Sequence, residues 1–227
     1  MKTVAIIPAF NEEKRVFQAI SDVYGFVDDV VVVDDCSLDK TGERAFEAGA
    51  HVLRHIVNRG QGAALQTGTD YALKNLCADI IVHFDADGQM QGSDVPNLIA
   101  PIETGEAQVV LGSRFLGAEA KDMPTTRLVT LQAAMWFTRF LSGIKITDTH
   151  CGFRALSAEA AGSIRLTMNR MAHASELLDI LVAKRLPYVE RPVTIRYSSE
   201  TLRKGQSFMS GFIILKDLFK GRFIDEL

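Results

Sequence analysis

Two aspartates spaced two positions apart, Asp85 and Asp87, directly follow an apolar run of this sequence. Because side chains at positions i and i+2 of an extended segment point to the same side, the two carboxylates can converge where the run ends. Like charges held together away from water are costly unless a cation neutralises them. Such oxygen ligands suit Mg²⁺ or Mn²⁺, ions that often join protein carboxylates to substrate phosphates. The spacing alone leaves two interpretations open, a metal–phosphate site or a turn in which Asp serves only local hydrogen bonds, and the rest of the chain favours the metal–phosphate site.

The elements that position these residues alternate between short apolar runs and helix-like segments, which indicates a parallel sheet with helices on both faces. Runs such as VVVDD and IIVHFD are nearly all apolar, as is typical of strands covered on both faces. The fold class is therefore α/β with a mostly parallel central sheet. The expected strands are Thr3–Pro8, Val30–Asp34, Ala50–Leu53, Ile80–Phe84 and Val109–Ser113. The expected helices are Glu12–Tyr24, Lys40–Ala48, Gly62–Leu76 and Val95–Thr104.

Ligands of such sheets bind beyond the carboxyl ends of the strands. Three expected strands end there in polar clusters, with the letters PAFNE, DDCS and DAD, which predicts one shared site. At this edge the Asp35 carboxylate can accept hydrogen bonds from a nucleobase or ribose, whereas Asp39 is expected to cap the next helix. The stretch Asn58–Leu65 lacks the third glycine of a dinucleotide fingerprint, so we interpret it only as a glycine-bearing turn near a nucleotide.

The second half of the chain is less regular, and no linker rich in Gly, Ser or Pro divides it. We therefore expect one domain over residues 1–227, with 207–227 as a C-terminal amphipathic helical extension. That helix either closes the core or lies in a membrane interface. The further expected elements are helices at Thr126–Leu141, Ser157–Ile164, His173–Arg185 and Ser207–Lys220, and strands at Lys145–Thr147 and Val189–Tyr197.

The composition limits the function classes. The chain has 227 residues, of which 47% are hydrophobic and 23% charged, as in an ordinary soluble protein. A net charge of −3 argues against a nucleic-acid partner. The cysteines Cys36, Cys77 and Cys151 lack metal-ligand spacing, and we expect reduced thiols in a cytoplasmic protein. We expect neither a signal peptide nor a membrane span, because no apolar run approaches the ~20 residues that a span needs.

The ordered motifs PAFNEE, VVVDDCSLDKT, NRGQGAALQTG, FDADGQ and GSRF resemble family 2 glycosyltransferases of the GT-A fold, over about Thr3 to Arg154. The resemblance implies a GT-A nucleotide-diphospho-sugar transferase fold, a nucleotide-sugar donor, a divalent metal and inversion at the sugar. By the same resemblance, the nucleoside pocket would be lined by Pro8, Phe10, Glu12 and Asp35. The metal would be held by Asp85 and Asp87, with Gln89 beside it.

The segment Asp148–Arg154, with the letters DTHCGFR, is similar to dolichol-phosphate-mannose-synthase-like enzymes. Ile195–Tyr197 and Lys204–Ser207 also resemble the loop that closes over the donor or acceptor in that group. This resemblance implies transfer of a hexose from a GDP-mannose or UDP-glucose type of donor to a polyprenyl phosphate. Lys204 would then contact the donor phosphates, and the protein would reach its lipid acceptor through peripheral membrane contact or through a partner.

A phosphate acceptor also fits the arginines. A phosphate monoester is already anionic near neutral pH, its second pKa being ~6, so it needs positioning cations more than a general base. Arginine binds phosphate through a bidentate fork. Arg114 ends an expected strand at the active edge, and Arg127 begins the next helix, whose N-terminus favours anions. We therefore predict that these two arginines hold the acceptor phosphate.

Three alternatives remain. The same fold could act on a sugar hydroxyl, with Asp148 as the general base; otherwise Asp148 orients Arg154 or the acceptor. A nucleotidyltransferase also pairs carboxylates with a metal, but the glycine- and lysine-rich loop expected after its first strand is missing. The third alternative is a non-catalytic nucleotide-sugar-binding protein. Glu176 is either a helix surface residue or part of the site, and His83 is expected to be packed within its strand.

Overall fold

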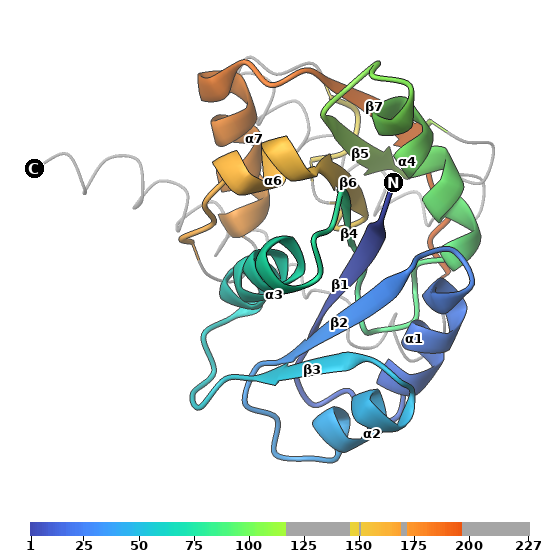
Figure 1. Ribbon diagram of the computed structural model, residues 1–227, viewed down its shortest axis with the longest axis vertical. Coiled ribbons are helices and arrows are strands. Elements are labelled where there is room, and N and C mark those ends of the chain that lie inside the picture. The colour runs from blue at the N-terminus through green and yellow to red at the C-terminus, as the bar shows by residue number, and fades with distance from the viewer. Residues whose placement is uncertain (117–145, 150, 169–171, 197–227) are drawn as a thin grey trace, which may run out of the picture.

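A computed structural model describes residues 1–116, 146–149, 151–168 and 172–196, and Figure 1 shows their arrangement. Its described strands form one seven-stranded sheet in the order β3-β2-β1-β4-β6-β5-β7. All neighbouring strands pair in parallel except β6, which is antiparallel to both β4 and β5. The predicted α/β class with a mostly parallel sheet is therefore confirmed. The strands are β1 (Thr3–Ala9), β2 (Asp29–Asp34), β3 (His51–Arg54), β4 (Ile80–His83), β5 (Val109–Ser113), β6 (Arg154–Ser157) and β7 (Tyr188–Pro192).

Helices cover both faces of the sheet because the strands are apolar on both sides. Along β1, Ala5 and Ile7 enter one core while Val4 and Ile6 enter the other, as the period of two in a strand requires. The first core is covered by α1 (Val16–Tyr24), α2 (Thr41–Glu47) and α4 (Val95–Glu103). The second is covered by α3 (Gln61–Asn75), α6 (Ala158–Ser163) and α7 (Ala172–Lys184), which Figure 1 shows on the opposite side of the sheet.

Several predicted boundaries differ from the structure. Helix α1 begins at Val16 rather than Glu12, because Asn11 takes a left-handed φ of 55° and residues 13–15 form a turn. Strand β7 ends at Pro192, opposite Ser113 where its partner β5 ends, instead of running to Tyr197. A short 3₁₀ helix, η1 (Gly92–Asp94), precedes α4.

Two predictions near the site were wrong. Strand β6 was not predicted, because its four residues begin with a charged Arg154 and so do not look like a buried strand. The strand predicted at Lys145–Thr147 is not observed, because Ile146 and Thr147 belong to no strand. The helix expected from Ser157 does form, with the Ser157 hydroxyl accepting a hydrogen bond from the Ala160 N–H at its start.

Some expected features lie outside the described residues: the helix at Thr126–Leu141, the C-terminal helix at Ser207–Lys220 with its 207–227 extension, and the side chains of Arg127 and Lys204. Within the part of the chain that the structure describes, none of the helices has the length and apolar character needed to cross a membrane.

Candidate active site

The two predicted metal carboxylates follow the carboxyl end of β4. The Phe84 N–H donates to Ile6 O at 3.0 Å, which extends the pairing with β1 by one residue before the chain turns at Asp85. The Asp87 carboxylate accepts a hydrogen bond from the Gln89 N–H at 3.0 Å, closing the turn. Burial, together with the nearby Asp87 carboxylate, raises the pKa of Asp85 to about 7, against the opposing charge of Arg154. Two carboxylates that repel each other in this way favour a bound cation.

Helix α3 contributes a residue that the sequence analysis did not single out. Gln61, its first residue, donates a side-chain hydrogen bond to Asp85 Oδ1 at 3.0 Å. Gly60 just before it has a φ of 85°, a backbone conformation that favours glycine. The expected glycine-bearing turn therefore places an amide beside the two predicted metal carboxylates. The NRGQG sequence indicates a glycine-bearing turn, but it does not indicate which strand end the glutamine side chain will face.

Asp35 holds this turn in place. Its buried carboxylate accepts hydrogen bonds from the Arg59 N–H at 2.8 Å and the Gly60 N–H at 2.7 Å. The same carboxylate lies 2.7 Å from His55 Nδ1, and His55 Nε2 lies 3.0 Å from Thr67 Oγ1. Asp35 and Asp85 are thus connected through Gly60 and Gln61. The predicted contact of Asp35 with a nucleoside remains a prediction, and a structural role in shaping the turn stands beside it.

The other predicted nucleoside residues lie at the same edge. Pro8 is near the end of β1, and Phe10 follows it with 46% of its surface exposed. The backbone N–H of Glu12 donates to Thr41 Oγ1 at 2.8 Å, and its carboxylate forms an ion pair with Arg15 at 2.6 Å. The structure therefore gathers the predicted pocket residues around the carboxyl ends of β1 and β2, as the parallel order requires.

Arg114 follows β5, and its guanidinium forms a bidentate ion pair with Asp148. Its Nε donates to Asp148 Oδ2 at 2.6 Å and its Nη2 donates to Asp148 Oδ1 at 2.7 Å. Both side chains are largely buried, with 13% of the Arg114 side chain and 2% of the Asp148 side chain exposed. The expectation that Asp148 orients Arg154 gains no support, because Arg154 donates through Nε to Cys151 O instead.

The segment 148–154 joins the two halves of the site. At one end Asp148 holds Arg114, and further along Gly152 lies so close to Asp85 that a Cβ at Gly152 would be 2.9 Å from Asp85 Oδ2. Cys151 is buried between them, and burial raises the pKa of its thiol to about 12. Arg154, which starts β6, is 2% exposed, and burial lowers its pKa. The short DTHCGFR sequence thus contains both the aspartate that binds Arg114 and the glycine that lies close to Asp85.

The segment expected to close the site also starts beside the carboxylates. Met90 forms an isolated bridge with Ile195, and the Arg196 N–H donates to Gln89 O at 2.8 Å. The last described residues, Ile195 and Arg196, therefore lie next to the segment that carries the predicted metal carboxylates.

Two residues that the sequence analysis weighed do not join the site. The Glu176 carboxylate accepts hydrogen bonds from the Thr167 and Met168 N–H groups at 2.9–3.0 Å, so it anchors a loop. His83 is packed within β4 as predicted, and burial lowers its pKa to about 3.

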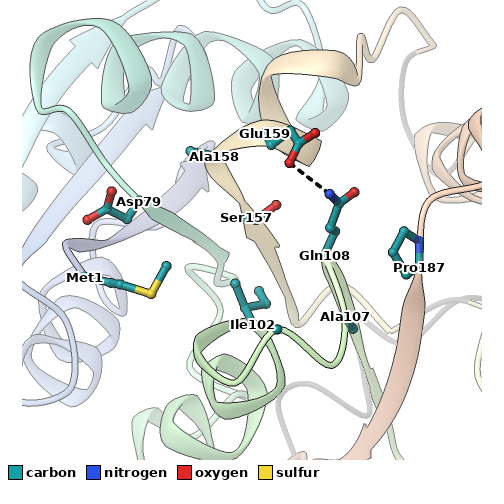
Figure 2. Close-up of a pocket in the computed structure, with 10 residues that line it drawn as sticks. Met1, Asp79, Ile102, Ala107, Gln108, Ser157, Ala158, Glu159 and Pro187 are labelled. Carbon is teal, nitrogen blue, oxygen red and sulfur yellow. Dashed lines mark hydrogen bonds between the residues drawn. The ribbon is translucent and has the colours of Figure 1, made fainter.

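A separate pocket of 430 Å³ lies at the opposite edge of the sheet; Figure 2 shows residues that line it. It is lined by residues at the amino ends of the parallel strands, among them Met1, Asp79 and Gln108, and Gln108 donates to Glu159 across it at 2.9 Å. Because ligands of parallel sheets bind at the carboxyl ends, this pocket is not the active site.

The described residues contain no group of three or more His, Cys, Asp or Glu side chains arranged to hold a metal ion. Two carboxylates with a neighbouring amide are instead an incomplete set. Mg²⁺ and similar ions are usually bound this way, with one or two protein carboxylates and the remaining positions filled by water and substrate phosphates. The residues present therefore fit an ion that binds together with a diphosphate.

Fold and site together define a glycosyltransferase of the GT-A fold. The chain belongs to glycosyl transferase family 2, whose family model matches residues 4–164. It is 33% identical to a UDP-N-acetylglucosamine–dolichyl-phosphate N-acetylglucosaminyltransferase of Methanococcus voltae, over 92% of this chain and 91% of the relative. It is 30% identical to a polyprenol monophosphomannose synthase of Mycolicibacterium smegmatis, over 96% of this chain and 85% of the relative.

Among solved structures, glucosyl-3-phosphoglycerate synthase of Mycobacterium tuberculosis superposes with a TM-score of 0.63 at 22% identity, covering 89% of this chain and 73% of that one. That crystal structure contains Mn²⁺, UDP and phosphoglyceric acid. At this identity the likeness establishes the fold alone.

Proposed function

We propose that this protein transfers a hexose or related sugar from a nucleotide-sugar donor to a polyprenyl phosphate. The observation that carries the proposal is the placement of two opposite charges at one sheet edge. The Asp85 and Asp87 carboxylates call for a cation. Arg114 lies at the same edge, beyond the end of β5, which β6 separates from β4, and the segment 148–152 joins it to the carboxylates. The two relatives named above, which are dolichyl-phosphate and polyprenol enzymes, support the same acceptor class.

In the proposed reaction, an oxygen of the acceptor phosphate attacks the anomeric carbon of the sugar. The bond from that carbon to the nucleoside diphosphate breaks, and the diphosphate leaves with the electron pair. Inversion at the anomeric carbon follows from a single displacement. The acceptor is already anionic near neutral pH, so no side chain needs to remove a proton.

The role of the metal in this proposal is limited to charge. Asp85 and Asp87, with Gln89 beside them, would hold Mg²⁺ or Mn²⁺, which when bound supplies positive charge to the departing diphosphate. Gln61 fixes the orientation of the Asp85 carboxylate. The Mycobacterium tuberculosis structure, which has the same fold, contains Mn²⁺.

The alternative acceptor, a sugar hydroxyl, would need Asp148 as a general base. Asp148 is 5% exposed, and both of its carboxylate oxygens accept hydrogen bonds from the Arg114 guanidinium. A carboxylate paired in this way with a buried arginine is a poor base, because the pairing stabilises its charged form. This observation favours the phosphate acceptor. Peripheral membrane contact, through which the protein would reach such a lipid, belongs to the same proposal.

The reaction class can be tested by identifying the released nucleotide. The protein is incubated with GDP-mannose, UDP-glucose and UDP-N-acetylglucosamine in turn, with polyprenyl phosphate and Mg²⁺ or Mn²⁺. We expect a nucleoside diphosphate and a glycolipid, both lost when a chelator is added. Release of pyrophosphate would instead identify a nucleotidyltransferase, and binding of the sugar nucleotide without any turnover would identify a non-catalytic protein.

A further inference from the structure

Glu190, on β7, has no role in the proposed reaction so far, although its carboxylate accepts hydrogen bonds from the segment that carries Asp148. Its two carboxylate oxygens each accept a hydrogen bond from the Thr147 N–H at 2.9 Å. Its Oε1 also accepts from the Thr147 hydroxyl at 2.9 Å and from the Asp148 N–H at 3.2 Å. Hydrogen bonds to a charged carboxylate are about twice as strong as those between neutral groups. One carboxylate thus binds two successive backbone N–H groups of the segment 147–148.

This segment depends on the side-chain anchor because it belongs to no strand. Ile146 and Thr147 do not pair with β5, although β5 ends beside them. The direct contact to that strand is between hydroxyls: Ser113 Oγ lies 2.6 Å from Thr147 Oγ1. The backbone N–H groups of Thr147 and Asp148 both donate to the Glu190 carboxylate. The position of Asp148 is therefore set from β7.

Asp148 in turn sets the position of Arg114. Arg114 lies just beyond β5, so the sheet does not fix its side chain, whereas Asp148 binds both its guanidinium and its backbone N–H, the latter at 3.1 Å. A guanidinium has five N–H donors, and a bidentate carboxylate fixes the plane of the fork with two of them. A chain of contacts therefore runs from Glu190 through Thr147 and Asp148 to the predicted acceptor arginine.

We propose that Glu190 is a positioning residue for the acceptor: through Thr147 and Asp148 it holds the Arg114 fork in the orientation that receives the acceptor phosphate. The inference rests on the proposed function and adds a residue to it. Glu190 does not touch the reacting atoms. Its effect should therefore appear in the use of the acceptor and not in the use of the sugar donor, which binds at the other half of the site.

The test is a double-mutant cycle on the full chain, with Glu190→Ala, Arg114→Ala and the double variant. We expect Glu190→Ala to raise the KM for polyprenyl phosphate about tenfold or more, because small displacements of a positioned group are costly, while the KM for the sugar donor changes less than about twofold. In the double variant, Glu190→Ala should add almost nothing to the acceptor defect of Arg114→Ala, since residues that act through one another are not additive.

Two further variants keep the test decisive. Glu190→Gln preserves the shape of the side chain and one oxygen that accepts hydrogen bonds, so it should retain part of the affinity for polyprenyl phosphate. It replaces the alanine variant in the test if that variant folds poorly. Glu106→Ala is the control: it removes an exposed carboxylate that pairs at 2.7 Å with Arg191, the residue that follows Glu190 in the chain. This variant should leave both KM values unchanged. Circular dichroism and thermal melting verify the fold of each variant.

The outcomes separate this inference from the proposed function. If the wild-type protein forms glycolipid but Glu190→Ala and Glu190→Gln affect both substrates equally, or if the cycle is additive, the positioning role is wrong. If the wild-type protein turns over a sugar nucleotide but never glycosylates polyprenyl phosphate, the proposed acceptor is wrong and the inference falls with it. Selective and non-additive loss of acceptor affinity supports both.

Discussion

Gly152 and Asp85 lie so close together that residue 152 has no room for a side chain: a Cβ there would be 2.9 Å from Asp85 Oδ2 and 3.3 Å from the Met90 methyl group. Asp85 cannot move away freely, because Gln61 donates to its other oxygen at 3.0 Å. The observed position of the Asp85 carboxylate therefore requires glycine at residue 152, because a side chain there would clash with it.

Gly152→Ala should consequently displace the Asp85 carboxylate. We expect the Mn²⁺ or Mg²⁺ concentration for half-maximal transfer to rise about tenfold or more, by analogy with the loss caused by altered ligand orientation at metal sites. Gly162→Ala is the matched control, since a Cβ at Gly162 meets nothing within 4 Å. If both variants require the same metal concentration for half-maximal transfer, the close approach of Gly152 to Asp85 does not affect metal binding.

Asp87→Ala should abolish metal-dependent transfer while leaving the fold intact. Removing one of two carboxylates that hold an ion loses the charge stabilisation of the leaving diphosphate, and we expect a fall in kcat of about 10²-fold or more. Asp70→Ala is a suitable control, because Asp70 is a carboxylate on α3 that pairs with the exposed Arg165. Retained activity in the Asp87 variant would rule out the metal assignment.

Gln61→Ala tests the residue that the sequence analysis did not predict. It removes a hydrogen bond that orients Asp85 without removing a charge, so the loss of metal affinity should be about 10-fold, at the lower end of the range for such supporting contacts. The comparison is Gln108→Ala, which breaks a similar amide–carboxylate bond at the opposite edge of the sheet (Figure 2). Equal metal titrations for these two glutamine variants would exclude a role for Gln61.

Arg114→Ala should impair the acceptor more than the donor. We expect at least about a tenfold rise in the KM for polyprenyl phosphate, because a bidentate arginine fork is lost, and Arg114→Lys should not restore it. Arg165→Ala removes an arginine that also pairs with an aspartate, Asp70 at 2.6 Å, but through a single nitrogen and at an exposed position, and should have no effect. A proportional rise in the KM of both substrates would contradict the acceptor role.

The cysteines should differ sharply in reactivity. Only the thiolate is nucleophilic, and the raised pKa of Cys151, about 12, keeps its thiol protonated up to pH 9 and beyond. Cys77 is exposed. Treating the native protein with iodoacetamide at pH 8 should therefore modify Cys77 and spare Cys151 until a denaturant is added, as peptide mass spectrometry can measure. Rapid labelling of Cys151 in the native protein would mean that the segment beside Asp85 opens readily.

The sequence predicted the first half of the fold well because its signals there are local. Strands such as Val30–Asp34 are continuous apolar runs, and the parallel order alone brings Asp35 and Asp85 to one edge. The later strands were harder, since β6 carries a buried arginine whose charge hides the apolar pattern. A four-residue strand inserted antiparallel between two others also has no signal in the βα alternation.

The candidate site was predicted in its residue types but not in its pairings. The sequence identified Arg114 and Asp148 separately, and the bidentate contact between them joins residues far apart in the chain. The same holds for Gln61 with Asp85 and for Glu190 with Thr147, whose partners are set by strand order and loop geometry. The pattern of a single sequence indicates how residues are spaced within one helix or strand. It does not indicate which residues from different elements the strand order brings into contact.

The most direct test of the central claim compares polyprenyl phosphate with the matching polyprenol as acceptors, with the same sugar nucleotide and Mn²⁺ or Mg²⁺. The two lipids differ only in the phosphate. We predict glycolipid from the phosphate and none from the alcohol, because in the proposed reaction Arg114 binds the acceptor anion, and because Asp148 is paired with that arginine and is a poor base. Transfer to the polyprenol, or to a sugar hydroxyl while polyprenyl phosphate remains unused, would contradict the account.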